Sequence, residues 1–574
     1  MDERVSRAEA VMDDLAKRVE ALERRVAAIE AQPMAAVEES AARRVEATEV
    51  RAPRAADTVS ILSVVGRTLV VLGGGYLLRA LTESGMLPST AGVLLGFGYA
   101  ALLLFASDRA SRKGGRLSAT AHGVAAVLLA YPLLWEVTTR FSLVSPAMSA
   151  LALAAFSAAA LAVAWRRGQQ AFAWAATLAG LATSLGLLVV TGSTVPYALF
   201  LVALGIGTLW LGYHRNWTLL RWPVALAADF AAVGLILRAM SEARTDRPGV
   251  VVAVLLALVG AYLASIAART LALGRNVIPF EVAQTTAAIV VGLGGAVMVS
   301  RATGMATVGL GASSVALGAV SYLVAFAFVD RRQGRGKNFY FYTSLGIVFT
   351  LVGGHLLLQG ASQVAAWAVM AALAAWLGAR YARLALGLHS AAYLTAAAID
   401  GGVLGWSAGI LAGAAARTWT APVVGALLVV GGGLMSVAAG RCAGSERERR
   451  VAGLSRLAVA AIVVWVSGGL LIATMMQVLA GRGMAATPGV VATTRTVILA
   501  VASIGLAWAA RFERLKEWGW LVYPILLGTA LKLLLEDLRV SPASALFVAF
   551  AAYGVALAFA PRLLRGAGGS PTRG

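Results

Sequence analysis

The stretch that decides the fold is residues 59–88, VSILSVVGRTLVVLGGGYLLRALTESGMLP. Its mostly apolar first part, residues 59–81, is long enough as a helix to cross the roughly 30 Å hydrocarbon core of a bilayer. Arg67 lies well inside this part, and Arg79 and Glu83 follow near its far end. The stretch therefore predicts a first membrane span that carries a charge within the lipid.

The rest of the chain contains further apolar stretches of similar length. Of the 574 residues, 59% are hydrophobic and 13% are charged, and the mean hydropathy is +0.79. One water-soluble core cannot bury so much apolar surface. We therefore predict an all-α, polytopic transmembrane protein with about 18 spans and both termini cytoplasmic. The predicted spans cover residues 59–81, 90–107, 118–138, 143–165, 171–191, 195–213, 220–240, 249–267, 282–300, 304–329, 338–358, 363–379, 386–406, 418–440, 457–479, 492–511, 519–535 and 542–560.

The charge distribution supports this orientation. Residues 1–58 hold 10 of the 49 Lys and Arg residues and 13 of the 28 Asp and Glu residues, so the positive excess lies in the remaining chain. There, the proposed inner loops and the C-terminal tail hold 27 Lys and Arg residues, the outer loops and adjoining span ends hold 11, and Arg67 is the remaining one. This asymmetry is the positive-inside pattern of a multi-pass protein. It argues against a nucleic-acid surface, so the bilayer is the partner that we predict.

Residues 1–32 have the heptad pattern of a coiled coil. The a positions are Val5, Met12, Val19 and Val26, and the d positions are Ala8, Leu15, Leu22 and Ile29. Arginines at g positions face glutamates at e positions of a partner helix, which favours a parallel pair. We expect a homo-oligomer through residues 5–29; the alternative is a single amphipathic helix. Residues 33–57 are predicted to be a linker, 58–561 the membrane domain and 562–574 a cytoplasmic tail.

One region does not fit a simple span. Residues 384–417 are too long for one crossing and short for two, and they contain Asp400 and several glycines. We expect one span followed by an irregular or re-entrant piece, whose backbone must be shielded by protein. Gly401, Gly405, Gly409 and Gly413 recur every four residues, which predicts a smooth face for close helix packing.

The sequence contains no motif that indicates an enzyme, a cofactor or a metal. A Walker A pattern is absent, and the single cysteine, Cys442, and the four histidines show no metal-ligand spacing. We expect His122, His355 and His389 to form hydrogen bonds between helices. Catalytic residues are therefore not assigned.

Charges inside the spans are the stronger signal, because a charged side chain at mid-bilayer costs about 2.5–3.5 kcal/mol unless it finds a partner. Arg67 and Asp229 lie at similar depths in their spans, so we expect them to pair. The pair is either part of a path for protons or substrate, or a salt bridge that orients two helices.

A second polar group is predicted near the outer ends of the spans. Its candidate members are Arg79, Glu83, Glu136, Lys532, Glu536 and Asp537. Lys532 and Glu536 are four residues apart on one helix face. The two acids lie at a helix C-terminus, where the helix dipole disfavours them, so a cation should compensate them. The alternative is ordinary snorkelling of long side chains to the interface.

The two ends of the membrane region resemble a known family. GRTLVVLGGGYLLRALTESGMLP follows the charged leader, and LGTALKLLLEDLRVSPASALFVAFAAYGVALAFAPRLLR closes the chain with Lys532, Asp537 and Leu538 in matching places. Both resemble a bacterial family of predicted many-span membrane proteins known only as domain of unknown function twenty-three thirty-nine. The resemblance implies a multi-pass protein of the bacterial cytoplasmic membrane and supplies no activity.

Three functional classes remain open at this point. Many spans and intramembrane charges favour transport or flipping of a small or lipid-like substrate. The heptads favour a non-catalytic assembly or scaffold protein that oligomerises through its coiled coil. A transferase acting on lipid-linked substrates ranks last, because the outer loops are short.

Overall fold

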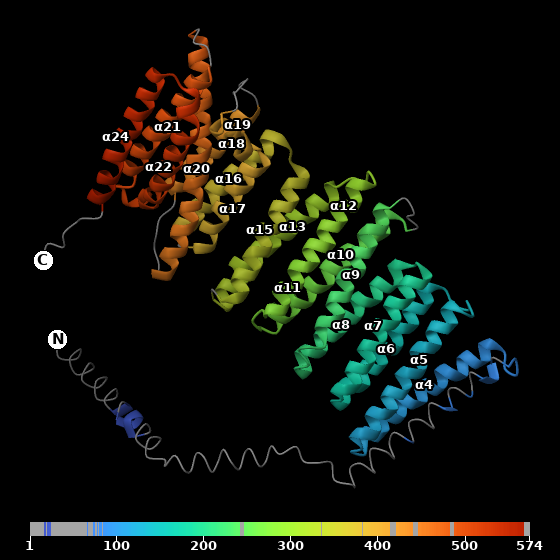
Figure 1. Ribbon diagram of the computed structural model, residues 1–574. Coiled ribbons are helices and arrows are strands. Elements are labelled where there is room, and N and C mark those ends of the chain that lie inside the picture. Colours follow the sequence, from blue (N-terminus) through green and yellow to red (C-terminus); the bar gives the residue numbers. More distant parts are fainter. Residues whose placement is uncertain are drawn as a thin grey trace, which may run out of the picture. The chain divides into compact units, whose positions relative to one another are not determined.

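The computed structural model describes residues 17–18, 20–24, 66, 73–74, 77, 80–82, 84–241, 246–334, 336–381, 383–413, 421–439, 446–482 and 487–567 (Figure 1). Every regular element in these ranges is helical. The chain divides into two compact units, residues 1–224 and 225–574. The first predicted span, with Arg67, Arg79 and Glu83, lies almost entirely outside the described residues, as does most of the predicted coiled coil.

The described part of the first unit contains five long helices that follow one another with short connections. They are α4 (Ser89–Arg112), α5 (Arg116–Thr139), α6 (Pro146–Arg167), α7 (Gln170–Thr191) and α8 (Thr194–Arg215). Helix α4 packs on α5, and α6 packs on both α7 and α8. Local sequence sets the ends of α6: the Ser145 hydroxyl accepts a hydrogen bond from the Met148 N–H, and Gly168 ends the helix in a left-handed conformation.

The second unit begins within α9 (Arg221–Met240). It continues with α10 (Pro248–Ala267), η1 (Ala268–Ala272), α11 (Pro279–Ala287), η2 (Ala288–Leu293), α12 (Gly294–Ala302), α13 (Val308–Leu323), η3 (Val324–Val329), α14 (Asp330–Arg332), α15 (Lys337–Leu357) and α16 (Gly360–Arg380). The η1, η2 and η3 segments are π-helical, and each continues a neighbouring α-helix. Thus several predicted spans are composite helices.

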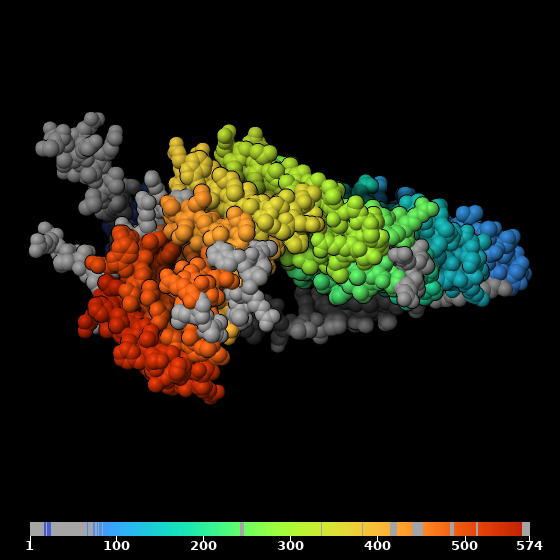
Figure 2. Space-filling model, turned by 90° about the horizontal axis from the view of Figure 1, so that it is seen from above, coloured from blue at the N-terminus to red at the C-terminus, as the bar shows by residue number. Residues whose placement is uncertain are grey.

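The second unit ends with α17 (Leu384–Asp400), α18 (Val403–Leu411), α19 (Ala421–Ala439), α20 (Glu446–Gly481), α21 (Pro488–Ala509), η4 (Glu513–Leu521), α22 (Val522–Lys532), η5 (Leu533–Asp537), α23 (Leu538–Val540) and α24 (Ala543–Ala567). Helix α21 packs against α20, α22 and α24. The orange and red residues of this last part form one block in the space-filling view (Figure 2).

Fifteen helices in the described ranges are long and apolar enough to cross a membrane, and the count is sixteen if one bent pair forms a single span. Helix α19 has a shorter apolar core, Pro422–Ala438. These helices coincide with the predicted spans from residues 90–107 onward. Large apolar side chains such as Leu102, Phe230 and Leu527 are exposed, as expected of surfaces that face lipid. The chain is a polytopic, all-α membrane protein.

The bent pair is α17 and α18, which meet at 68°. This agrees with the prediction of one span plus an irregular piece. The break has a local cause, because Gly402 adopts φ +63°, a left-handed conformation that favours glycine and interrupts the helix.

The predicted glycine stripe is wrong as one continuous face. Gly401 precedes the break, and Gly413 follows α18 with φ +98°, so only Gly405 and Gly409 share a helix. A Cβ on Gly405 would meet nothing within 4 Å. The close approach of α18 to α20 uses Ser407 instead, whose Oγ lies 2.6 Å from the position of a Cβ on Gly469.

Candidate functional site

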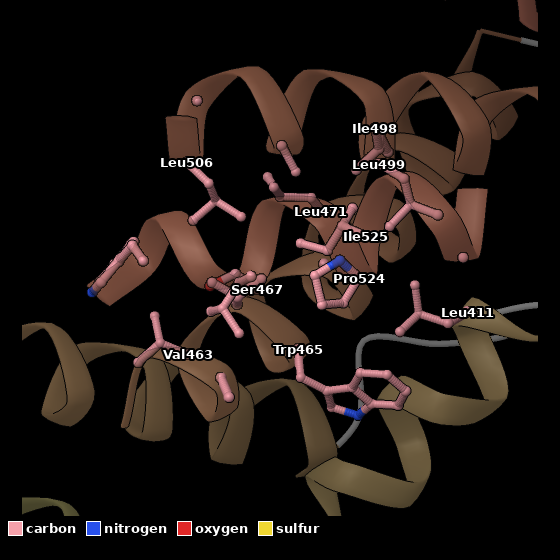
Figure 3. A pocket seen from close by; sticks show the side chains of 18 of the residues that line it. Leu411, Val463, Trp465, Ser467, Leu471, Ile498, Leu499, Leu506, Pro524 and Ile525 are labelled. Carbon is pink, nitrogen blue, oxygen red and sulfur yellow. The ribbon is translucent and has the colours of Figure 1, made fainter. Parts of the chain in front are cut away.

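The candidate site is a cavity of about 620 Å³ bounded mainly by α20, α21 and α22, a volume within the usual range of ligand pockets. Figure 3 shows Trp465, Leu499 and Pro524 around it, each from a different one of these helices. Leu411, the last residue of α18, also lines it; α18 is the second helix of the bent pair. The polar side chains in the lining are few: Ser467, Thr529, Lys532 and the indoles of Trp465 and Trp518.

Three glycines help to keep this space open. Gly468, Gly505 and Gly528 line the cavity from α20, α21 and α22, and a Cβ built on any of them would meet nothing within 4 Å. Side chains at these positions would project into unfilled space. These three glycines are therefore the positions at which a substitution can test whether the cavity is used.

Lys532 closes one part of the wall but offers no free hydrogen-bond donor. Its ammonium group donates to the Ala492 carbonyl at 2.7 Å, to the Thr496 hydroxyl at 2.8 Å and to the Asp537 carboxylate. A lysine ammonium has three N–H groups, so these acceptors use all of them. What Lys532 presents to the cavity is thus its apolar stem.

The other residues of this charged cluster are also paired. The Arg495 guanidinium donates from both terminal nitrogens to Glu536, at 2.6 and 2.7 Å. The Thr496 hydroxyl donates to Asp537 Oδ2 at 2.5 Å. Asp537 is fully buried and Arg495 is 2% exposed. Two cations and two carboxylates in mutual contact form a neutral group, which makes their burial tolerable.

The π-helical segment η5 explains which acid Lys532 binds. In a π-helix the backbone bonds join residues five positions apart, so Asp537 lies beside Lys532. Glu536, four positions on, remains at ion-pair distance from the Lys532 ammonium, 3.9 Å, but its hydrogen bonds come from Arg495.

The predicted outer polar group is therefore brought together in part. Lys532, Glu536 and Asp537 form one cluster, and Arg495 supplies the compensating cation that the two acids required. Glu136 lies on α5 of the first unit, and Arg79 and Glu83 lie outside the described residues. Sequence reasoning missed Arg495 and Thr496, although an arginine seven residues after Pro488, the first residue of α21, was a detectable signal.

Asp229 lies on α9 and is 8% exposed. Its Oδ1 accepts a hydrogen bond from the Gln284 amide of α11, at 3.0 Å. Its predicted partner, Arg67, lies outside the described residues, so that pairing stays a prediction.

A third polar group surrounds Asp400 at the break between α17 and α18. Its carboxylate accepts hydrogen bonds from the Gln363 amide and, at 2.9 Å, from the Trp367 indole. His355 Nδ1 lies 3.5 Å from Asp400 and 2.9 Å from the Gln363 amide nitrogen. This group joins α15, α16 and α17, so His355 links helices as predicted.

The other two histidines differ. His389 of α17 bonds with Tyr322 of α13, again between helices. His122 is 2.6 Å from the Ser118 carbonyl in its own helix, so the prediction of an interhelical bond is wrong there. A histidine can satisfy itself four residues back along a helix, which spacing alone does not reveal.

The chain matches no protein-family model, no curated protein and no solved structure.

Proposed function

We propose that this membrane protein binds the hydrocarbon chain of a lipid-like substrate in the α20–α22 cavity and moves that substrate across the bilayer. The observation that carries the proposal is the cavity itself: it lies among membrane-spanning helices, and its lining is almost wholly apolar. Because Lys532 has no free N–H group, an apolar chain fits this wall better than an ion or a charged headgroup does.

The length of the cavity supports a chain-like occupant. On α21 its lining runs from Ile498 to Ala509, which corresponds to about 17 Å at 1.5 Å per residue. That is more than half of a hydrocarbon core roughly 30 Å thick.

The bent helix pair supports movement rather than storage alone. Carriers commonly place substrate sites beside interrupted helices, and α18, the second half of the bent pair, reaches the cavity through Leu411. The resemblance at both ends of the chain favours the bacterial cytoplasmic membrane as the location.

The test is lipid movement in proteoliposomes that contain the full-length protein and a phospholipid with a fluorescent acyl chain. Dithionite added outside reports how fast labelled lipid from the inner leaflet becomes accessible. We expect the wild-type protein to accelerate this exchange and Gly505→Leu, which fills the cavity, to abolish most of the acceleration. Gly554→Leu on α24 is the matched control, because a Cβ there also meets nothing within 4 Å and Gly554 does not line the cavity. Equal rates for the two variants, or no acceleration by the wild type, would contradict the proposal.

A second candidate function is assembly through the N-terminal heptads. The described fragment of this region is helical and carries an exposed ion pair between Arg24 and Glu20 of 2.6 Å. Deletion of residues 1–50 tests it: loss of self-association with normal membrane insertion and unchanged lipid movement would assign the leader to assembly alone.

A further inference from the structure

A second cavity of about 460 Å³ lies between α13 with its extension η3, α16 and α17. One face of each helix lines it at helical spacing. The lining includes Tyr322 and Phe326, Met370 and Leu377 of α16, and His389 and Tyr393 of α17. Phe326 lies in the π-helical segment η3, a distortion that is frequent at functional sites.

The polar part of this cavity is a short hydrogen-bond chain. The Tyr322 hydroxyl lies 3.0 Å from His389 Nδ1 and 3.1 Å from the Tyr393 hydroxyl. The bond to Tyr322 is the one hydrogen bond of the His389 side chain within the described part of the protein. The other ring nitrogen, Nε2, has no partner there. His389 itself is 7% exposed. A molecule in the cavity could therefore bond to Nε2.

The hydrogen-bond chain allows His389 Nε2 to act either as a donor or as an acceptor. If Tyr322 donates to Nδ1, neutral His389 carries its proton on Nε2 and is a donor there. If Nδ1 donates to Tyr322, Nε2 is an acceptor. A carbonyl group satisfies the first arrangement, and a hydroxyl group satisfies both.

The charged side chain in the described lining is already paired, which disfavours an ionic ligand group. Among the described residues of the lining, Arg383 is the one that carries a charge, and its guanidinium binds both carboxylate oxygens of Asp330, at 2.8 and 2.5 Å. His389 is five residues beyond Leu384, the first residue of α17, which is about 8 Å along the helix. An ionised headgroup at that depth would find no unpaired charge among the described residues of the lining.

We infer that this cavity binds a neutral lipophilic molecule whose hydroxyl or carbonyl group bonds to His389 Nε2 and whose hydrocarbon part contacts the apolar faces of α16 and α17. The ordinary acyl chain of a bilayer lipid is the competing occupant, and it would leave Nε2 without a partner. The inference does not depend on the proposal for the α20–α22 cavity.

The test is photolabelling of the full-length protein in detergent with a diazirine derivative of hexadecanol, compared with the same derivative of hexadecane. Labelled peptides are identified by mass spectrometry. We expect the alcohol to label residues 370–377 more strongly than the alkane does. His389→Leu should reduce the alcohol yield roughly fivefold, the effect of one lost hydrogen bond, and leave the alkane yield unchanged. His389→Gln, which keeps a hydrogen-bonding side chain, should retain most of the alcohol yield.

A competition on the wild-type protein makes the test independent of how the variants fold. Unlabelled hexadecanol should suppress labelling by the alcohol probe at a lower concentration than unlabelled hexadecane does. Equal labelling by the two probes, equal competition, or an alcohol yield that a folded His389→Leu variant leaves unchanged would overturn the inference.

Discussion

Two cavities of the second unit differ in what their polar residues offer to a ligand. In the α20–α22 cavity, Lys532 belongs to a neutral cluster that uses all of its N–H groups. In the α13–α16–α17 cavity, the hydrogen bonds from Tyr393 through Tyr322 reach Nδ1 of His389, whose Nε2 has no partner among the described residues. A charged residue in a cavity wall therefore does not by itself show that the ligand is charged. Whether the residue can bind a ligand depends on how many of its hydrogen-bonding groups already have partners.

The largest effect should come from breaking the satisfied cluster. Asp537→Ala leaves Lys532 and Thr496 without their buried acceptor, so we expect the protein to lose about 3–5 kcal/mol of stability. Thermal unfolding in detergent, followed by intrinsic fluorescence, measures this loss. Arg539→Ala is the control, because Arg539 is an exposed residue two positions away.

Removing both charges should recover much of the stability that Asp537→Ala loses. The double variant Lys532→Met with Asp537→Leu replaces the buried pair by apolar side chains of similar size, which is often tolerated.

The single variants decide whether the cluster is buried and satisfied. If Asp537→Ala unfolds at the same temperature as Arg539→Ala does, the cluster is not such a group.

Breaking the hydrogen-bond chain of the α13–α16–α17 cavity should cost less stability than breaking the ionic cluster. Tyr322→Phe removes one hydroxyl and leaves the ring in place, so we expect a loss of about 1–3 kcal/mol from the groups left unpaired. Tyr340→Phe is the control, since Tyr340 is 41% exposed. A loss as large as that of Asp537→Ala would show that the chain is a structural element comparable to the ionic cluster, and would weaken the comparison.

The smallest effect is expected where the first cavity is filled. Gly505→Leu adds a side chain in open space and improves helix propensity, so stability should change by no more than about 1 kcal/mol. Gly353→Ala is the contrast, because a Cβ there would lie 2.7 Å from the Gly311 carbonyl oxygen and should cost about 1–3 kcal/mol. The same unfolding assay ranks the two variants; a Gly505→Leu protein that is the less stable of them would mean that the space is not open.

The sequence was sufficient for the all-α, multi-span architecture, because the length of an apolar helix that crosses a membrane follows directly from the thickness of the bilayer. It also placed Lys532, Glu536 and Asp537 in one polar group. It could not show which acid accepts the hydrogen bond of Lys532, because the π-helical segment η5 brings Asp537, five residues onward, beside the ammonium group. The cation that binds Glu536 comes from α21, and only tertiary packing brings Arg495 there.

Neutral sites are harder to find from sequence than charged ones. Tyr322, His389 and Tyr393 carry no unusual spacing, and their bonds join α13 to α17 across 67 and 71 residues of sequence. The interrupted glycine stripe shows the opposite error, since a regular spacing predicted one face where Gly402 ends the helix.

The most direct test of the central claim is where a phospholipid chain lies in the purified protein. A phospholipid with a diazirine near the middle of one acyl chain can be reconstituted with the full-length protein, photolysed and mapped by mass spectrometry. We predict labelling of α20, α21 and α22 at residues that line the cavity, and its loss in Gly505→Leu but not in Gly554→Leu. Labelling that is confined to lipid-facing residues outside the cavity, or that is the same in both variants, would contradict the claim.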